Sequence, residues 1–135
     1  VAAGSTIDNV YFDPNYGGTN IYDILALEAQ YPDKTFVYWT TSLARTVGTQ
    51  DAQSFNDQMR AWARANGKVL LDVAAIESHA PDGSVCRNGQ GYEVICVNYT
   101  TESDGGHLGS VSAGKIQIAK AMWVMLAQLA GWVPN

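Results

Sequence analysis

Apolar residues recur at helical spacing in three segments of the chain. The first predicted helix begins at a cap on Thr19 or Asn20 and continues to about residue 30, where the turn-forming run 31–33 ends it. The second spans about 51–66 and ends at Gly67, with its apolar positions at Phe55, Met59, Trp62 and Ala63. The third begins at Ser110 or Ser112 and continues to about residue 129, and the apolar run 119–132 predicts that it is buried.

Two segments lack helical spacing and are rich in β-branched and aromatic residues. The segments 34–41 and 68–73 therefore predict strands that are covered on both faces. A short strand at 7–12 is a further possibility, and 78–103 predicts a long loop or small hairpin. The order helix, strand, helix, strand, loop, helix predicts parallel strands with right-handed crossovers and helices on both faces. This is a three-layer α/β/α fold with a short, mainly parallel sheet.

The predicted sheet is small for this class of fold. At 135 residues the chain forms one domain, 1–135. A doubly wound sheet normally has about five strands, whereas two or three are visible here. We therefore expect an incomplete, flavodoxin-like domain with an open, apolar sheet edge.

Composition removes several functional classes. The chain has 8 Lys and Arg against 13 Asp and Glu, and this acidic balance offers no basic stripe for nucleic acid. The most apolar run, 119–132, is too short to span a bilayer. The chain begins at Val1 with no secretory leader pattern, so we expect a processed or cut piece. We expect no metal and no cofactor.

The two cysteines point to an extracellular protein. Cys86 and Cys96 flank a loop rich in turn residues, where a disulfide is favoured over two reduced thiols. Disulfides persist in oxidising compartments, which favours secretion. Asn98 begins an Asn-Tyr-Thr sequence, which fits the glycosylation acceptor pattern if the host glycosylates.

The strongest chemical signal is the run Asp104-Gly105-Gly106-His107, directly before the last helix. A carboxylate can fix the tautomer of an imidazole, and the imidazole can then accept a proton from a hydroxyl nucleophile. The alternative is a surface turn in which Asp104 binds backbone amides.

The order of these features resembles the C-terminal half of the SGNH (GDSL-type) hydrolases over about residues 19–132. The features that match, in order, are a helix ending in Tyr-Pro-Asp at 31–33, the strand 35–40 with its sequel 41–43, the helix containing 55–57, the strand 69–73 with its sequel 76–78, the run 81–84, the pair 99–100, and the Asp-x-x-His run at 104–107.

The resemblance implies a three-layer fold and a Ser-His-Asp machinery for ester or acyl hydrolysis. It assigns the triad acid to Asp104 and the base to His107. The family's nucleophilic serine and its glycine and asparagine oxyanion donors have no counterpart in this sequence, and Gly4-Ser5-Thr6 matches Gly-Asp-Ser only superficially. The chain would then need a separate N-terminal fragment of the same domain, and its substrate would be a lipid, acylated sugar or small acyl ester. The rival hypothesis is a non-catalytic remnant that associates with itself or with a partner chain through the open edge.

Other candidates have simpler explanations. His79, next to Ser78 and Glu77, is favoured as a solvated loop residue over a Ser-His-Glu site, and Ser42 lacks the glycine turn of a nucleophile elbow. Asp72 is expected to end its strand and bind backbone donors. Three tryptophans, at 39, 62 and 123, are expected in the core, with Trp132 free for carbohydrate stacking. A calcium site at residues 8, 13 and 15 lacks the loop pattern such a site requires.

Overall fold

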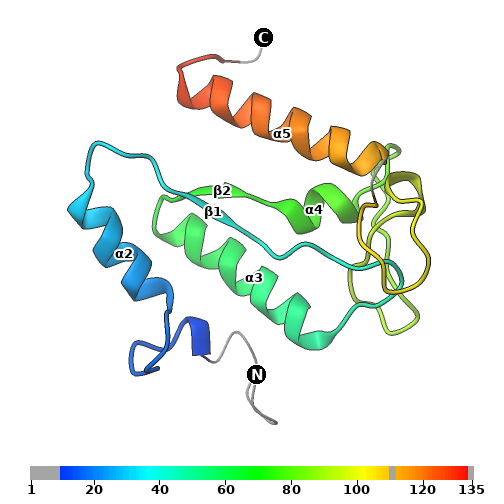
Figure 1. Cartoon of the computed structure of the whole chain (residues 1–135), viewed down its shortest axis with the longest axis horizontal. Helices are drawn as coiled ribbons and strands as arrows, with labels where there is room; N and C mark the ends of the chain where they lie inside the picture. The colour runs from blue at the N-terminus through cyan, green and yellow to red at the C-terminus, as the bar shows by residue number, and fades with distance from the viewer. Residues whose placement is uncertain (1–9, 110–111, 134–135) are drawn as a thin grey trace.

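In the computed structural model, residues 10–109 and 112–133 are described. Their elements in chain order are α2 (Ile21–Gln30), β1 (Val37–Trp39), α3 (Gln50–Ala65), β2 (Val69–Leu71), α4 (Val73–Ser78), the 3-10 helix η1 (Val97–Tyr99) and α5 (Ala113–Leu129) (Figure 1). The mixed α/β class is therefore confirmed, whereas the three-layer arrangement stays a prediction.

The sheet is a single parallel pair. Val37 pairs with Val69 and Trp39 with Leu71, and α3 forms the crossover between the two strands. Thr40 N–H extends the ladder by donating to Leu71 O. Both strands are shorter than the predicted segments, because Asp72 ends β2 by accepting a hydrogen bond from Ala75 N–H over 3.0 Å as the N-cap of α4. The capping role expected for Asp72 is thus confirmed, and the short helix that follows it was not predicted.

Two of the helix starts follow the predicted capping signals. Asn20 caps α2 in a capping box with Asp23, whereas the cap of α3 at Thr49 was not predicted. Ser112 caps α5, while Ser110 lies outside the described residues. The strand considered at 7–12 is wrong for Val10 and Tyr11, which are helical, and 7–9 lie outside the described residues.

Two clusters of buried apolar side chains form the core. The first joins α2, β1 and α3, and consists of Ile21, Tyr38, Phe55 and Met59. The second lies under the long loop between α4 and α5, and consists of Leu43, Ala74, Ile95, Cys96, Tyr99 and Leu108. The second cluster supports the segments that carry the candidate site.

The last helix departs from its predicted burial. Gly114 is its one buried residue among those described, and a Cβ there would lie 2.7 Å from the carbonyl oxygen of Tyr99, so glycine permits the first turn to pack closely. Farther along α5, Trp123 is 76% exposed. Trp39 on β1 is also exposed, so the expectation of a core position is wrong for these two residues, whereas Trp62 packs against the ring of Tyr38. An apolar pattern does not show which faces are covered, and the described residues leave Trp39 and Trp123 exposed.

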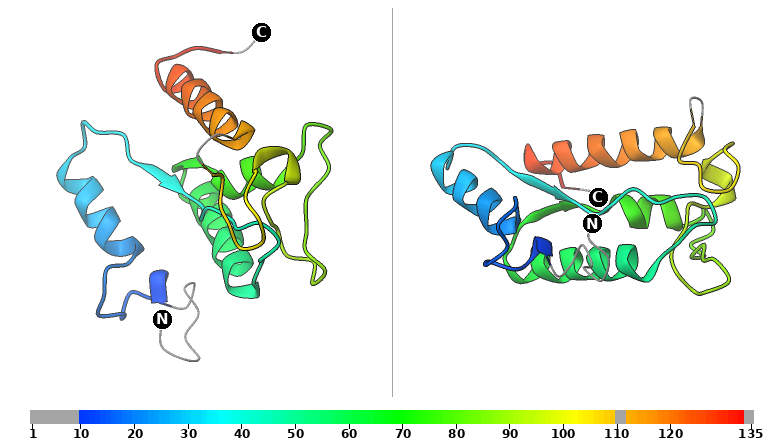
Figure 2. Two further views of the ribbon diagram at one scale, coloured as in Figure 1. Left: turned by 45° about the vertical axis from the view of Figure 1, so that its right-hand side comes forward. Right: turned by 60° about the horizontal axis from the view of Figure 1, so that its bottom comes forward.

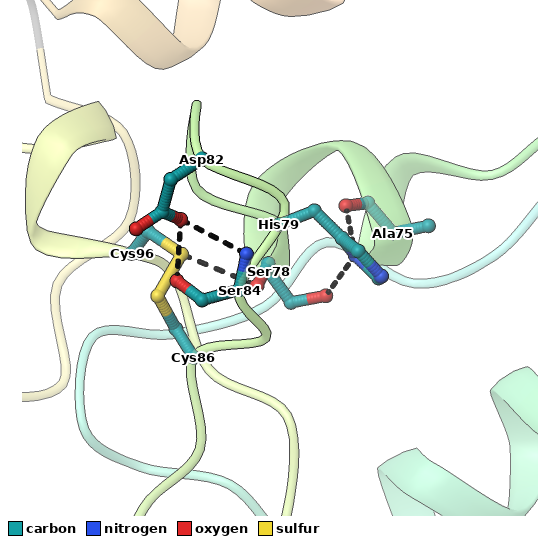
Figure 3. The surroundings of a disulfide bond; sticks show 7 residues. All are labelled: Ala75, Ser78, His79, Asp82, Ser84, Cys86 and Cys96. Carbon is teal, nitrogen blue, oxygen red and sulfur yellow. Dashed lines mark hydrogen bonds between the residues drawn. A yellow bond between two sulfur atoms is a disulfide. The ribbon is translucent and has the colours of Figure 1, made fainter.

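The predicted disulfide closes the long loop, which is held against α4 by backbone hydrogen bonds. Cys86 and Cys96 are bonded with an S–S distance of 2.01 Å, and no described cysteine is free. Cys86 N–H donates to Ser78 O, and Cys96 N–H donates to Glu77 O. The Sγ of Cys96 also lies 3.2 Å from the carbonyl oxygen of Ser78 (Figure 3), a contact without a proton because a disulfide sulfur carries none. The end of α4 is therefore held by both cysteine residues.

Candidate functional site

The candidate site lies where the chain leaves the two parallel strands. The segment 42–45 follows β1 and is hydrogen-bonded on one side to Glu77, in the helix that follows β2, and on the other to the turn 103–107 (Figures 1 and 2). In parallel α/β sheets, ligands bind outside the carboxyl ends of the strands. The fold thus places the predicted motif at the edge expected for chemistry.

The turn that carries His107 is fastened by backbone hydrogen bonds. Gly105 N–H donates to Arg45 O over 2.8 Å, and Arg45 N–H donates to Gly106 O over 2.7 Å. The hydroxyl of Thr100 donates to the carbonyl oxygen of His107 itself. These three hydrogen bonds fix the backbone of the turn, and so fix the position from which the imidazole of His107 extends.

Both glycines of the motif are required by this geometry. Gly105 has a φ of +81°, in the left-handed region that disfavours residues with a side chain. A Cβ on Gly106 would lie 2.5 Å from the Cβ of Glu102 and 3.1 Å from the carbonyl oxygen of Ser103. The turn can therefore form with Gly-Gly at these positions and is disfavoured by larger residues.

His107 is exposed, and one of its ring nitrogens has a defined partner. Its Nδ1 lies 2.7 Å from the carbonyl oxygen of Leu43. A carbonyl oxygen only accepts, so Nδ1 carries the proton of the neutral ring and Nε2 holds the lone pair. Among the described residues, no hydrogen bond reaches Nε2. That arrangement suits a general base.

Asp104 does not occupy the position that the resemblance implies. It is exposed, and within the described part of the chain no hydrogen bond joins its carboxylate to His107. The Nδ1 atom that a triad acid would contact is taken by Leu43 O. The assignment of Asp104 and His107 as a catalytic pair stays a prediction.

A buried carboxylate that the sequence analysis weighed only as part of a Ser-His-Glu site with His79 is hydrogen-bonded to Leu43. Glu77 is 1% exposed, and its Oε2 accepts from Leu43 N–H over 2.6 Å. Its Oε1 accepts from Ser42 Oγ over 3.0 Å. Burial raises the pKa of Glu77, an effect opposed by these two hydrogen bonds and by the charge of His107. The sequence offered one signal, an acidic residue in the segment after the second strand.

The remaining sequence candidates have structural roles. His79 is exposed and its Nδ1 lies 2.9 Å from Ala75 O, nearer than the 3.3 Å to the hydroxyl of Ser78 (Figure 3). Ser78 is fully buried, out of reach of a substrate. Asp13 accepts hydrogen bonds from Asn15 within a turn. Asp8 and Ser5 lie outside the described residues, and no cluster of metal-ligating side chains occurs among the residues that are described.

Asp72 belongs to an ion-pair network beside β2. Its Oδ2 lies 2.7 Å from Arg60 Nε, and Arg60 also contacts Glu93 and Asp57. The network joins α3, the end of β2 and the disulfide loop, which indicates a structural role. In addition, no described helix is long and apolar enough to cross a membrane.

Comparison of the chain with protein-family models, with curated proteins and with solved structures gives no match. The functional argument therefore rests on the residues of the site.

Proposed function

We propose that this chain is the part of an ester or acyl hydrolase that carries the general base, with the nucleophilic serine supplied by a segment outside this sequence. The observation that carries the proposal is the hydrogen bond from His107 Nδ1–H to Leu43 O. It leaves Nε2 as a proton acceptor at an exposed position beside the carboxyl ends of two parallel strands.

In this mechanism His107 Nε2 removes the proton from the serine hydroxyl as the serine oxygen attacks the ester carbonyl. The same nitrogen then gives that proton to the leaving alcohol. In the second half of the reaction, water takes the place of the serine as nucleophile. His107 removes a proton from the water, the water oxygen attacks the acyl-serine ester, and the acid is released as the serine regains its proton. An acylated carbohydrate, lipid or small acyl ester is the expected substrate class.

No described strand pairs with the outer edge of β1, which supports docking of the missing segment. Thr40 N–H points toward β2, so the backbone groups of Val37 and Trp39 face away from it. An apolar groove of about 440 Å³ follows this edge and is bordered by Ile24, Phe55 and Met59. A parallel strand added here would end beside Leu43, which brings the residue that follows it close to His107.

Two measurements test the proposal. A fluorophosphonate probe, which labels activated serines, is applied to the native material, and the labelled species is identified by intact mass. Hydrolysis of p-nitrophenyl acetate is compared between the complete protein and its His107→Ala variant, where we expect a loss of about a hundredfold or more. The absence of any labelled serine, together with equal rates for both proteins, would overturn the proposal.

The disulfide supports an extracellular setting for the proposed hydrolase.

A second function, non-catalytic assembly, is favoured by the exposed apolar face of α5. Ile116, Trp123 and Leu126 of α5 are each more than half exposed, and an apolar helix face of this kind normally marks an interface. Sedimentation of the chain across concentrations, beside a Trp123→Gln variant, tests this hypothesis. Assembly predicts a concentration-dependent mass that the variant reduces, and a monomer at all concentrations would contradict it.

A further inference from the structure

Glu77 is joined to the candidate site by hydrogen bonds from a segment that is distant from it in the sequence. It lies in α4 and is 1% exposed, and both of its carboxylate oxygens accept hydrogen bonds from the segment that follows β1. Placing a carboxylate away from water is costly unless hydrogen bonds compensate for it. Its principal partner is the backbone N–H of Leu43, at 2.6 Å.

Leu43 connects this carboxylate to the imidazole. Its N–H donates to Glu77, and its C=O accepts from His107 Nδ1–H. The side chain of Leu43 is buried in the second core cluster, so the residue has little freedom to turn. The N–H and the carbonyl oxygen of Leu43 belong to adjacent peptide planes that meet at its Cα. The hydrogen bond to Glu77 and the buried side chain together restrict that junction, and so restrict the carbonyl oxygen that selects the tautomer of His107.

The charges of the two side chains also interact. The charge of His107 opposes the effect of burial on the pKa of Glu77, as a weaker cause than burial or the two hydrogen bonds. Orientation and charge stabilisation are the two tasks of the acid in a hydrolytic triad. The exposed Asp104 makes no hydrogen bond to the ring in the described structure.

We infer that Glu77 is a positioning residue for His107, which it holds through Leu43 in place of a direct contact from Asp104. This inference rests on the proposed function, because it gives Glu77 a role in the same site. It differs from the role that the resemblance implies for the carboxylate of the Asp-x-x-His motif.

The test reads the tautomer of His107 without any substrate. The chain has two histidines, so a His79→Gln background leaves His107 as the only one. At about pH 8.5, above the ordinary histidine pKa of about 6.5, the ¹⁵N shifts of the neutral ring report which nitrogen holds the proton. Three further changes are compared in this background, namely Asp104→Asn, Glu77→Gln and Glu77→Ala.

We expect the proton on Nδ1 in the background protein and in Asp104→Asn. Glu77→Gln should retain this tautomer, because the Gln carbonyl oxygen can still accept from Leu43 N–H, whereas Glu77→Ala should move the ring toward the Nε2–H tautomer. Met59→Ala, in the other core cluster, controls for lost stability and should leave the tautomer unchanged. If Glu77→Ala does not fold, the Asp104→Asn spectrum decides, since a tautomer change there assigns the role to Asp104.

The outcomes for the two proposals are separable. An unchanged tautomer in folded Glu77→Ala, or a changed one in Asp104→Asn, overturns the positioning role even if the complete protein hydrolyses esters. In the complete protein, Glu77→Ala should lower kcat about tenfold or more with little change in KM, and Glu77→Gln should recover part of the orientation but not the charge. If the complete protein and all of its variants lack esterase activity while the tautomers are as expected, the proposed reaction is contradicted and the positioning role is not.

Discussion

His107 donates a hydrogen bond from Nδ1 to the carbonyl oxygen of Leu43, a residue 64 positions earlier in the chain, over 2.7 Å. This bond joins the Asp-Gly-Gly-His turn to the segment that follows β1. It gives the imidazole a defined tautomer with a backbone acceptor, so the site does not require a side-chain carboxylate in direct contact with the ring. The consequence is that the geometry of the backbone around the site determines its chemistry.

The glycines of the turn should be the most sensitive surface positions of the chain. Replacing Gly105 by Ala forces a side chain into the left-handed region and should lower the free energy of unfolding by about 1–2 kcal/mol. Gly106→Ala should cost about 1–3 kcal/mol, because its Cβ would meet Glu102 and Ser103. Urea unfolding measures both.

Gly89→Ala is the matched control for these two changes, since a Cβ there meets no atom within 4 Å and its φ is ordinary. We expect an effect within about 0.5 kcal/mol. A loss of stability at Gly89 equal to that at Gly105 would show that the turn is not specially constrained.

The disulfide should stabilise the site as well as the loop. Removing it with Cys86→Ser and Cys96→Ser frees a loop of sequence separation 10 and should lower the free energy of unfolding by about 3 kcal/mol. Since Cys96 N–H donates to Glu77 O, the exchange of that amide with deuterium should also speed up. Ser84→Ala, in the exposed turn beside the loop, is the control and should be nearly neutral. Equal amide exchange with and without the disulfide would contradict the link to Glu77.

The local part of the fold was predictable because its causes are local. The caps at Asn20 and Ser112 and the strand end at Asp72 depend on side chains that bond backbone groups within three residues. Such signals can be read from sequence alone. The parallel pairing of the two strands followed from their connection by a helix.

The location of the candidate site could be predicted from the sequence, but the hydrogen bond that orients His107 could not. The sequence placed the motif directly before the last helix, and the turn lies beside the segment that leaves the carboxyl end of β1. The contact with Leu43 joins residues 64 positions apart and uses a backbone oxygen, which has no sequence signature. The exposure of Trp123 was missed for a related reason, because an apolar pattern indicates that a face needs a partner and does not identify the chain that provides one.

Acid should weaken the network around Arg60. Burial opposes ionisation of Asp72, but hydrogen bonds from Arg60, Ala75 N–H and Thr40 outweigh burial and lower the pKa of Asp72 below its ordinary value. A lowered pKa contributes stability that is present above about pH 4 and lost as the pH falls through the lowered value. Arg60→Met should therefore cost about 1–3 kcal/mol at pH 7 and less near pH 3.

Lys34→Met provides the control for that change. The pair that Lys34 forms with Asp33 is mostly solvent-exposed, with side chains 65% and 69% exposed, so its loss should be nearly neutral at either pH. An effect of Arg60→Met that does not depend on pH would contradict the role of Asp72.

Glu77 should give the opposite dependence on pH. Its pKa is raised above the ordinary value, first by burial, so the folded state favours the protonated form. The stability that this preference contributes is present below the ordinary Glu pKa of about 4.3 and is lost as the pH rises through the raised value. Glu77→Gln cannot ionise, and its stability relative to the unmodified protein should increase between about pH 4 and pH 7.

Glu28→Gln is the matched control. The hydrogen bond from Lys68 is the main cause that lowers the pKa of Glu28, so the stability of this variant relative to the unmodified protein should decrease over the same range. Urea unfolding at one-unit steps of pH measures both trends, and parallel trends in the two variants would show that the buried carboxylate of Glu77 is not held in the environment described.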